Sequence, residues 1–355
     1  MSSVPASASV LPPYNRLGLD YAHPPAHKIP GEIIDCHMHA GSVEQTKMFL
    51  AAADAYGIGR IWTMTGLENV PALKEAFPDR FEFIAVPNWQ SGGPNEPFIS
   101  DWCRRLDEFY ALGSRLIKFH QAPRTRVLWK MGLDHPLTHR VIKHAYDLGY
   151  HFMTHVGDPK TWFLPGKPYA DHAQFGTFNE QFPLLDQMLE EFPDRIHLGA
   201  HMGGSLEDLP ALTRRLERFP NYVIDSSATK WIIRAIADTA TVASNGNVAP
   251  GGSLGFEGTK TTLSQMRDFF IKFQDRILFG SDLVVGDRFN FDHYASRYWV
   301  HQTQWETPYR GESPIEDPDA TQPPQLVGLD LPPEVLVKLY RTNALRWLPR
   351  AWEGV

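Results

Sequence analysis

The stretch FPDRFEFIAV, residues 77–86, joins the end of a predicted helix to a predicted strand. Phenylalanine covers the core at the last helical turn, proline stops the helix, aspartate turns the chain, and an apolar run follows. The same joint returns as FPDRIHLGA at 192–200, and in looser form as FPNYVIDSS at 219–227 and FQDRILFGS at 273–281. Four copies of one helix-to-strand joint predict a chain in which helices and strands alternate.

A second type of joint places a glycine just after the last helical residue. Gly57, Gly113 and Gly149 stand at such positions, each before an apolar run, and glycine is favoured there because it adopts the left-handed conformation that ends helices. With the opening run IIDCHMHAG at 33–41, the seven joints predict eight strands. Eight strand-helix units favour an α/β fold of the closed (β/α)8 kind, a TIM barrel in a single domain. A doubly wound open sheet is the structural alternative.

The domain organisation follows from where the long connections fall. Residues 1–30 are rich in proline and serine, and we expect an irregular N-terminal arm before a barrel over residues 31–350. Long loops follow strands rather than helices, at 157–177, 227–258 and 283–331. In a barrel this asymmetry places the active site at the carboxyl ends of the strands. The aromatic-rich insertion 283–331 is expected to cover the pocket mouth or to form a dimer interface.

Composition excludes several classes of function. The 355 residues are 43% hydrophobic and carry a formal net charge of −7, so no basic surface for nucleic acid or anionic lipid is expected. The chain has two cysteines, no basic and apolar leader and no run of 18 apolar residues. We therefore expect a cytoplasmic protein with a small-molecule substrate, and neither a nucleic acid nor a membrane as its partner.

Histidines at the ends of strands indicate a metal centre. Alternation along a strand puts His37 and His39 on one face, at the barrel mouth. Alone, such a pair is more often the polar end of a strand. Three further strand ends supply His155, His201 and Asp282 at the same rim. Since imidazole and carboxylate bind zinc and other divalent transition metals, four strands with such groups at one rim predict a metal site.

The same strand ends resemble a known family. The chain resembles the amidohydrolase superfamily, and most closely its amidohydrolase-2 branch, which includes aminocarboxymuconate-semialdehyde decarboxylase and related metal-dependent hydrolases. The resemblance covers roughly residues 31–350 and rests on DCHMH at 35–39, LIKFHQ at 116–121, THVGDP at 154–159, GAHMGG at 199–204, FGSD at 279–282 and RTNALRWLP at 341–349.

The resemblance implies roles for individual residues. It makes His37, His39, His155 and Asp282 the ligands of one divalent metal ion, with zinc expected and manganese as the alternative. It makes His201 the catalytic or polarising histidine beside the metal. It also implies a homodimer.

The chemistry of these groups predicts the reaction class. A cation held by histidines and a carboxylate lowers the pKa of a bound water. Asp282 can take that proton and return it, while His201 can polarise a carbonyl or stabilise an oxyanion. We therefore expect a metal-dependent hydrolase of amides, esters or lactones. A metal-dependent non-oxidative decarboxylase (carboxy-lyase) is the alternative, because the same groups support loss of carbon dioxide from a carboxylated, conjugated substrate. A barrel that binds metal and ligand without turnover is a third reading.

Two polar positions have open roles. Asp35 lies on the face of His37 and His39 but deeper, where it either accepts a hydrogen bond from a ligand imidazole or makes a structural hydrogen bond. Lys118 stands two residues before His120 on the fourth strand, so both share a face. A carboxylated lysine bridges two metals in some amidohydrolases, whereas the branch resembled here is typically mononuclear. We therefore favour a charge pair or substrate contact for Lys118, and we expect Lys118 and His120 to bind substrate.

Aromatic and basic residues near the predicted mouth indicate the kind of ligand. Flat side chains favour a flat or cyclic ligand, although each can equally pack a long loop. The tryptophans that follow strands are Trp89, Trp162, Trp231, Trp299 and Trp305. Arg124 and Arg126 follow the fourth strand, where a guanidinium either holds a substrate carboxylate or stays solvated. Trp89 and Arg124 complete the expected contacts to a small, cyclic or aromatic, carboxylated substrate.

Overall fold

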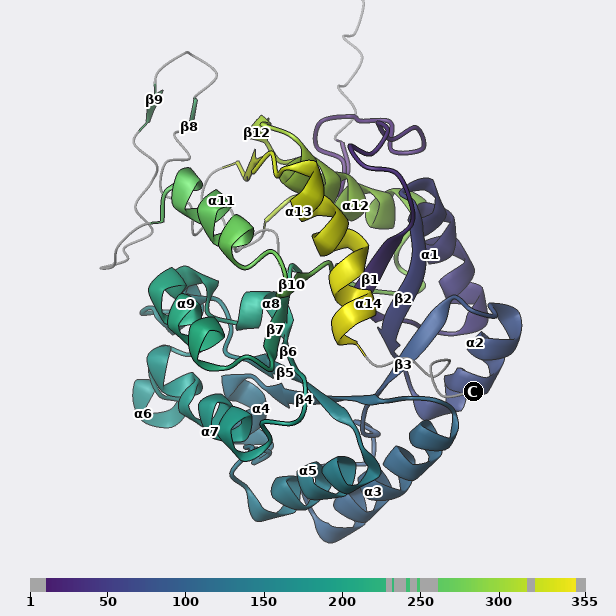
Figure 1. Cartoon of the computed structure of the whole chain (residues 1–355), viewed down its shortest axis with the longest axis vertical. Coiled ribbons are helices and arrows are strands. Elements are labelled where there is room, and N and C mark those ends of the chain that lie inside the picture. Colours follow the sequence, from purple (N-terminus) through teal and green to yellow (C-terminus); the bar gives the residue numbers. More distant parts are fainter. Residues whose placement is uncertain are drawn as a thin grey trace, which may run out of the picture.

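A closed parallel barrel forms the centre of the protein (Figure 1). The computed structural model describes residues 11–227, 261–317 and 323–348, with Ile232 and the short strands β8 (Thr241–Val242) and β9 (Val248–Ala249). Along the main sheet the order is β10-β7-β6-β5-β4-β3-β2-β1-β11, so neighbours in the chain are neighbours in the sheet. Its strands are β1 (Ile33–His39), β2 (Ile58–Met64), β3 (Phe81–Ala85), β4 (Leu116–Gln121), β5 (His151–Val156), β6 (His197–Gly199), β7 (Tyr222–Asp225), β10 (Ile277–Leu278) and β11 (Leu283–Val284).

The barrel closes through a single bent segment, residues 277–284. Its first part, β10, pairs with β7, and its second part, β11, pairs with β1. Between them the Cys36 N–H donates to the Phe279 carbonyl at 2.9 Å, and the Asp282 N–H donates to the His37 carbonyl at 2.6 Å. The two short strands therefore act together as the eighth strand, and the predicted (β/α)8 barrel is confirmed.

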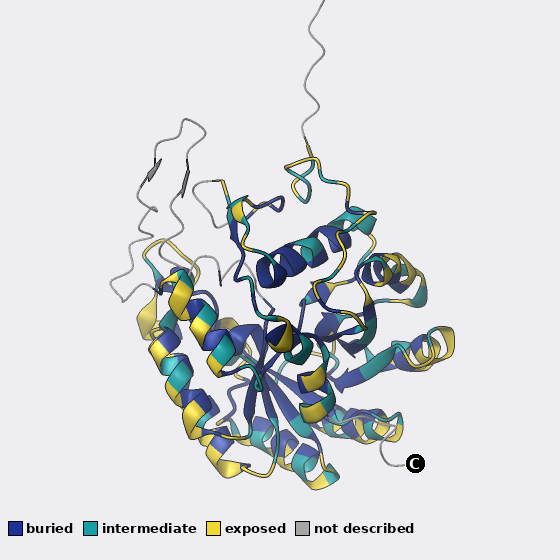
Figure 2. Ribbon diagram, turned by 45° about the horizontal axis from the view of Figure 1, so that its top comes forward, coloured by how far each residue is buried: buried dark blue, intermediate teal, exposed yellow. Residues whose placement is uncertain are grey.

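Helices surround the barrel, with exposed outer faces and buried strands inside (Figure 2). Among them, α3 lies beside α5 (Figure 1). The helices are α1 (Val43–Ala55), α2 (Val70–Ala76), α3 (Glu96–Ala111), α4 (Pro123–Leu128), α5 (Pro136–Leu148), α6 (His172–Phe175), α7 (Pro183–Glu191), α8 (Ala200–Gly203), α9 (Leu209–Arg218), α11 (Leu263–Lys272), α12 (Phe291–Glu306), α13 (Pro333–Val337) and α14 (Asn343–Trp347). Single turns are η1 (Leu67–Asn69), η2 (Lys160–Phe163), η3 (Asn179–Gln181), η4 (Leu206–Asp208) and η5 (Lys338–Thr342).

The joints between helices and strands have the expected geometry. Gly57, Gly113 and Gly149 all have positive φ angles, of 69°, 102° and 93°. At the FPDR joint of residues 77–80, Asp79 turns the chain with a φ of 64°, a conformation that aspartate tolerates better than most residues. Phe192 in the second copy is buried, as a residue that covers the core must be.

The segment 283–331 is not the long loop that the sequence predicted. It contains β11, the 16-residue helix α12 and an antiparallel pair formed by β12 (Arg310–Glu312) and β13 (Gln325–Val327). Tyr294 packs against Phe49 of α1, with ring centroids 5.5 Å apart, and Trp305 lies 5.0 Å from Phe270 of α11. The aromatic side chains of α12 therefore pack within the chain's own core instead of covering the pocket mouth. Because most of α12 is buried, its sequence shows no single apolar stripe.

The N-terminal residues 11–30 form neither helix nor strand and run along α12 and the β12–β13 pair. The Arg16 guanidinium donates to the Ser313 carbonyl at 3.0 Å, and the Gln302 amide donates to the Pro25 carbonyl at 2.9 Å. The predicted loop 157–177 contains η2 and α6, and most of 227–258 lies outside the described residues.

In the part of the chain that the structure describes, no helix is both long and apolar enough to cross a lipid bilayer.

Candidate metal centre

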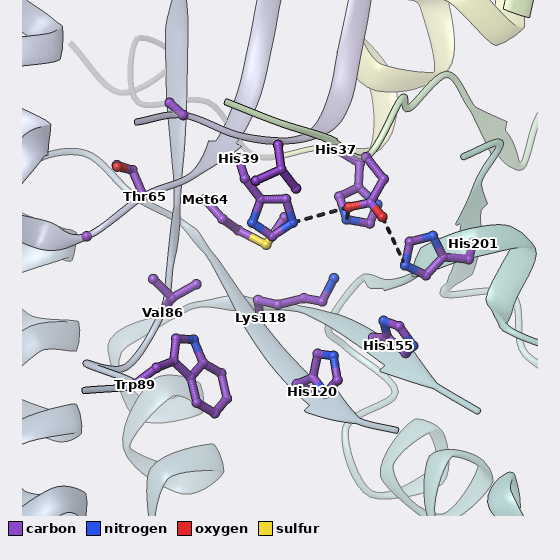
Figure 3. Close-up of a pocket in the computed structure, with 14 residues that line it drawn as sticks. His37, His39, Met64, Thr65, Val86, Trp89, Lys118, His120, His155 and His201 are labelled. Atoms are coloured by element: carbon purple, nitrogen blue, oxygen red, sulfur yellow. Dashed lines mark hydrogen bonds and ion pairs between the residues drawn. The ribbon is translucent and has the colours of Figure 1, made fainter. Parts of the chain in front are cut away.

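A cavity of about 420 Å³ opens at the carboxyl ends of the barrel strands. Its lining includes eight residues that the sequence predicted for the site, namely His37, His39, Trp89, Lys118, His120, His155, His201 and Asp282 (Figure 3). The barrel therefore brings side chains from six strands or strand ends into one space. A volume of this size suits a small molecule.

Three of these residues form a compact cluster of potential ligands. Asp282 Oδ1 lies 3.0 Å from His37 Nε2 and 3.2 Å from His39 Nε2. The ligand atoms of the three residues lie within 4.8 Å of one another. His37 is fully buried, and its Nε2 atom has no hydrogen-bond partner among the described residues. A buried nitrogen whose polar neighbours are a carboxylate and a second imidazole fits a divalent cation.

The charges within the cluster reinforce one another. Burial and the nearby Lys118 ammonium lower the pKa of His37, but the carboxylates of Asp282 and Asp225 outweigh them and raise it to about 9. Desolvation raises the pKa of Asp282, but the imidazoles of His37 and His201 outweigh it and hold this pKa well below its usual range. Asp282 is therefore a carboxylate, with the negative charge that a cation requires.

His201 reaches the cavity from a left-handed turn and not, as the sequence predicted, from the end of a strand. β6 stops at Gly199, and His201 follows with φ 55° and ψ 55°. Its Nε2 atom lies 3.7 Å from Asp282 Oδ2. The turn ends at Gly204, where a Cβ atom would lie 1.7 Å from the Val156 carbonyl oxygen. Only glycine fits at this position, so the last glycine of the GAHMGG motif is needed for the turn that places His201 in the cavity.

His155 lines the same cavity but does not join the cluster of His37, His39 and Asp282. Its Nε2 atom lies 2.9 Å from the Gly157 carbonyl oxygen and 3.2 Å from Asp158 Oδ1. The ring must turn before this nitrogen can face the cluster, so the ligand role of His155 stays a prediction.

Two aspartates behind the cluster have different roles. Asp35 accepts the His37 N–H at 3.1 Å and the Ser281 hydroxyl at 2.6 Å. It therefore makes structural hydrogen bonds, one of the two roles expected for it, and burial raises its pKa to about 6. The imidazole of His37 instead bonds to Asp225, with Nδ1 2.8 Å from Oδ2. Asp225 was not among the residues predicted for the site, although the run VIDSS places it at the end of the seventh strand.

The remaining walls of the cavity differ in character. Lys118 is buried, its amine points towards the imidazoles (Figure 3), and it has no hydrogen bond or ion pair with another described residue. Burial lowers the pKa of Lys118. His120 is held through Nδ1 by the Thr125 hydroxyl at 2.7 Å. Burial, with the neighbouring His155 and Lys118, lowers the pKa of His120 to about 2. The lining also includes the apolar side chains of Met64, Val86, Trp89 and Val284.

Several residues expected at the pocket lie elsewhere. Arg124 is exposed on α4 and does not line the cavity. The Arg126 guanidinium instead donates to the Phe175 carbonyl at 2.7 Å, so it links α4 to α6. Among the tryptophans other than Trp89, Trp162 packs on Tyr169 with ring centroids 5.9 Å apart. Trp299 and Trp305 belong to α12, and Trp231 lies outside the described residues.

Solved structures share this fold at low sequence identity. A 5-carboxyvanillate decarboxylase from Novosphingobium aromaticivorans, complexed with manganese and 4-hydroxy-3-methoxy-5-nitrobenzoic acid, is 12% identical, with a TM-score of 0.50 over 93% of this chain and 99% of that chain. A probable 2-pyrone-4,6-dicarboxylic acid hydrolase from Acinetobacter baumannii, with citric acid bound, is 13% identical, with a TM-score of 0.42 over 71% of this chain and 84% of that chain. At 12% identity, the likeness to the decarboxylase is one of fold alone.

Sequence comparison assigns the family. No curated protein matches the chain. The model of the amidohydrolase-2 family, described as Amidohydrolase, matches residues 34–350, which contain every residue of the cluster described above. The chain therefore belongs to the amidohydrolase family, whose members are metal-dependent enzymes.

Proposed function

We propose that this enzyme is a metal-dependent hydrolase that cleaves an amide, ester or lactone bond of a small, cyclic or aromatic, carboxylated substrate. The observation that carries the proposal is the cluster of His37, His39 and Asp282 at one end of a cavity of about 420 Å³. Family membership supports the reaction class.

The metal of this site is proposed to be zinc, with manganese as the alternative. His37, His39 and Asp282 would hold it, and the buried Nε2 atom of His37, 3.0 Å from Asp282 Oδ1, supports this assignment. We keep His155 as the expected fourth ligand, on the strength of the resemblance. A divalent cation in this position would polarise a water molecule and a substrate carbonyl.

The chain's own residues supply the proton transfers. Asp282 is held as a carboxylate, so one of its oxygens can take a proton from water and pass it to the leaving group. His201 lies on the other side of Asp282, where its Nε2 atom is the second group able to exchange a proton with the reacting atoms.

The two walls of the cavity support the substrate class. Lys118 offers a buried amine without a partner among the described residues, which suits a substrate carboxylate. His120 projects from the same face of β4. On the other side Trp89 and Met64 offer an apolar surface for a flat ring. A molecule with a ring at one end and a carboxylate at the other fits both walls.

A decarboxylase of the carboxy-lyase type is the second candidate. The apolar residues Val86, Trp89 and Val284 favour it, because an apolar surface disfavours a carboxylate relative to neutral carbon dioxide. The active groups would be the same, with a protonated Asp282 or His201 returning a proton to the ring.

The test is a paired assay of enzyme loaded with zinc or manganese. One arm follows hydrolysis of cyclic esters, lactones and amides that carry a carboxylate. The other follows carbon dioxide release from aromatic and unsaturated acids. Hydrolysis without carbon dioxide supports the first function, and carbon dioxide release assigns the second. Metal binding with no turnover in either arm contradicts both.

A further inference from the structure

Asp225 connects the two histidines that flank Asp282. It lies at the end of β7 and is fully buried. Its Oδ2 atom is 2.8 Å from Nδ1 of His37, and its Oδ1 atom accepts the backbone N–H of His201 at 3.1 Å. One carboxylate thus contacts a residue of β1 and a residue of the turn that follows β6.

Ser227 extends this contact to the ring of His201. Its hydroxyl oxygen lies 2.5 Å from Asp225 Oδ1 and 2.9 Å from His201 Nδ1. An ionised carboxylate can only accept hydrogen bonds, so the single hydroxyl proton of Ser227 must point to Asp225. The serine oxygen is then left to accept, and His201 Nδ1 must carry the proton that it accepts. The same rule applied to Asp225 Oδ2 requires a proton on His37 Nδ1.

We propose that Asp225 and Ser227 are positioning residues that keep the Nδ1 atoms of both His37 and His201 protonated. The Nε2 atom of each ring, which faces Asp282, is then the nitrogen that would bind a cation or exchange a proton. The hydrogen-bond argument stands on its own, but its consequence for metal binding rests on the proposed function.

The inference changes the role expected for His201. A neutral His201 with a proton on Nδ1 presents a lone pair from Nε2, so it accepts a proton from the reacting atoms and does not donate one to a carbonyl.

The variant Asp225→Asn makes the proposal testable. Three donors face Oδ1 of Asp225, namely the Ser227 N–H, the Ser227 hydroxyl and the His201 N–H. The amide oxygen of the asparagine must therefore take that side, and its NH2 group must face His37 Nδ1. His37 can accept from this group only by moving its proton to Nε2, the atom that faces the metal site.

The experiment uses full-length protein labelled with 15N-histidine. Long-range 1H–15N spectra show which ring nitrogen carries the proton, and His37→Gln and His201→Gln variants assign the two rings. We expect a proton on Nδ1 of both rings in the wild type, in metal-free and zinc-loaded samples. Asp225→Asn should move the His37 proton to Nε2 and weaken zinc binding, measured against a chromophoric chelator, by about 10- to 100-fold.

Ser227→Ala is the matched control, because it keeps the Asp225 carboxylate and the proton on His37 while removing the acceptor for His201. Zinc affinity should then change much less than in Asp225→Asn. A wild-type ring protonated only at Nε2 overturns the proposal even if Asp225→Asn does not fold. So does an Asp225→Asn protein that keeps wild-type spectra and zinc affinity. A protein that shows both Nδ1 protons but binds no metal refutes the proposed function and leaves this inference standing.

Discussion

His201 Nε2 lies 3.7 Å from Asp282 Oδ2, and both residues have a φ angle of 55°. A left-handed backbone costs a residue other than glycine about 1–2 kcal/mol, and such strain gathers at functional sites. Hydrogen bonds hold both residues in place, from the Asp282 N–H to the His37 carbonyl and from the His201 N–H to Asp225. The barrel therefore presents its two proposed proton carriers from strained backbone, His201 in the turn after β6 and Asp282 at the bend between β10 and β11.

Replacing Asp282 by asparagine should separate chemistry from metal binding. Asp282→Asn keeps an oxygen for the metal but cannot take a proton from water at neutral pH, so turnover should fall by at least about a hundredfold. Metal content, measured by elemental analysis, should fall much less because His37 and His39 remain. Near-normal turnover of a wild-type substrate would move the role of proton carrier to His201.

The metal content of the protein should depend on His37. We expect about one divalent metal ion per chain in the wild type and almost none in His37→Ala, since the loss of one imidazole leaves an incomplete ligand set. His139→Ala is the matched control, because His139 pairs with Glu191 at 2.9 Å outside the site. Wild-type metal content in His37→Ala would contradict the proposed centre.

Lys118 should contribute to substrate binding through its amine. Lys118→Met keeps the length of the side chain but removes its donors, and a hydrogen bond to a charged group is worth about 1.5–3 kcal/mol. The KM for a carboxylated substrate should rise about tenfold to a hundredfold, while the KM for its methyl ester should change little. Two metals per wild-type chain, with one lost in Lys118→Met, would instead make Lys118 a bridging ligand.

Two glycines with positive φ should respond differently to alanine. Gly149 has a φ of 93° and open space around it, whereas a Cβ atom on Gly204 would lie 1.7 Å from the Val156 carbonyl oxygen. Gly149→Ala should therefore lower the free energy of unfolding in urea by about 1–2 kcal/mol. Gly204→Ala should lower it further and reduce turnover, because the turn that holds His201 must move. Equal effects of the two substitutions would show that the turn is not tightly packed.

The contact between His27 and Glu306 should make stability depend on pH. His27 Nδ1 lies 2.6 Å from the Glu306 carboxylate, and its Nε2 lies 3.0 Å from the Tyr56 carbonyl oxygen. Burial lowers the pKa of His27, but Glu306 outweighs it and raises this pKa above 6.5. Burial raises the pKa of Glu306, but hydrogen bonds from His27, the Lys28 N–H and Tyr340 hold it below 4.5.

The sign of each shift defines the pH window of this contact. Because the pKa of His27 is raised, this histidine stabilises the fold at pH values below 6.5, and the stabilisation is lost as pH rises through its folded-state pKa. Because the pKa of Glu306 is lowered, this glutamate stabilises the fold at pH values above 4.5, and the stabilisation is lost as pH falls through its folded-state pKa. Glu306→Gln should therefore lower Tm most between these two values, and less at more alkaline pH. A Tm difference that is constant across pH would exclude the ion pair as its source.

Local signals in the sequence determined the order of the elements. The FPDR joints and the glycines at 57, 113 and 149 act within a few residues, because they set φ angles and stop helices wherever they occur. Alternation along β1 places His37 and His39 on one face, and the barrel then brings Asp282 to the same rim. The barrel and most of the residues that line the cavity were therefore predictable.

Only the tertiary structure decided which groups touch. Nothing near His37 in the sequence indicates that its Nδ1 atom bonds to Asp225, 188 positions away. The direction of the His155 ring depends on its contact with the carbonyl of Gly157. The burial of α12 depends on the elements that surround this helix. Hydrogen bonds and packing between distant segments depend on positions in space, which local propensity and periodicity do not specify.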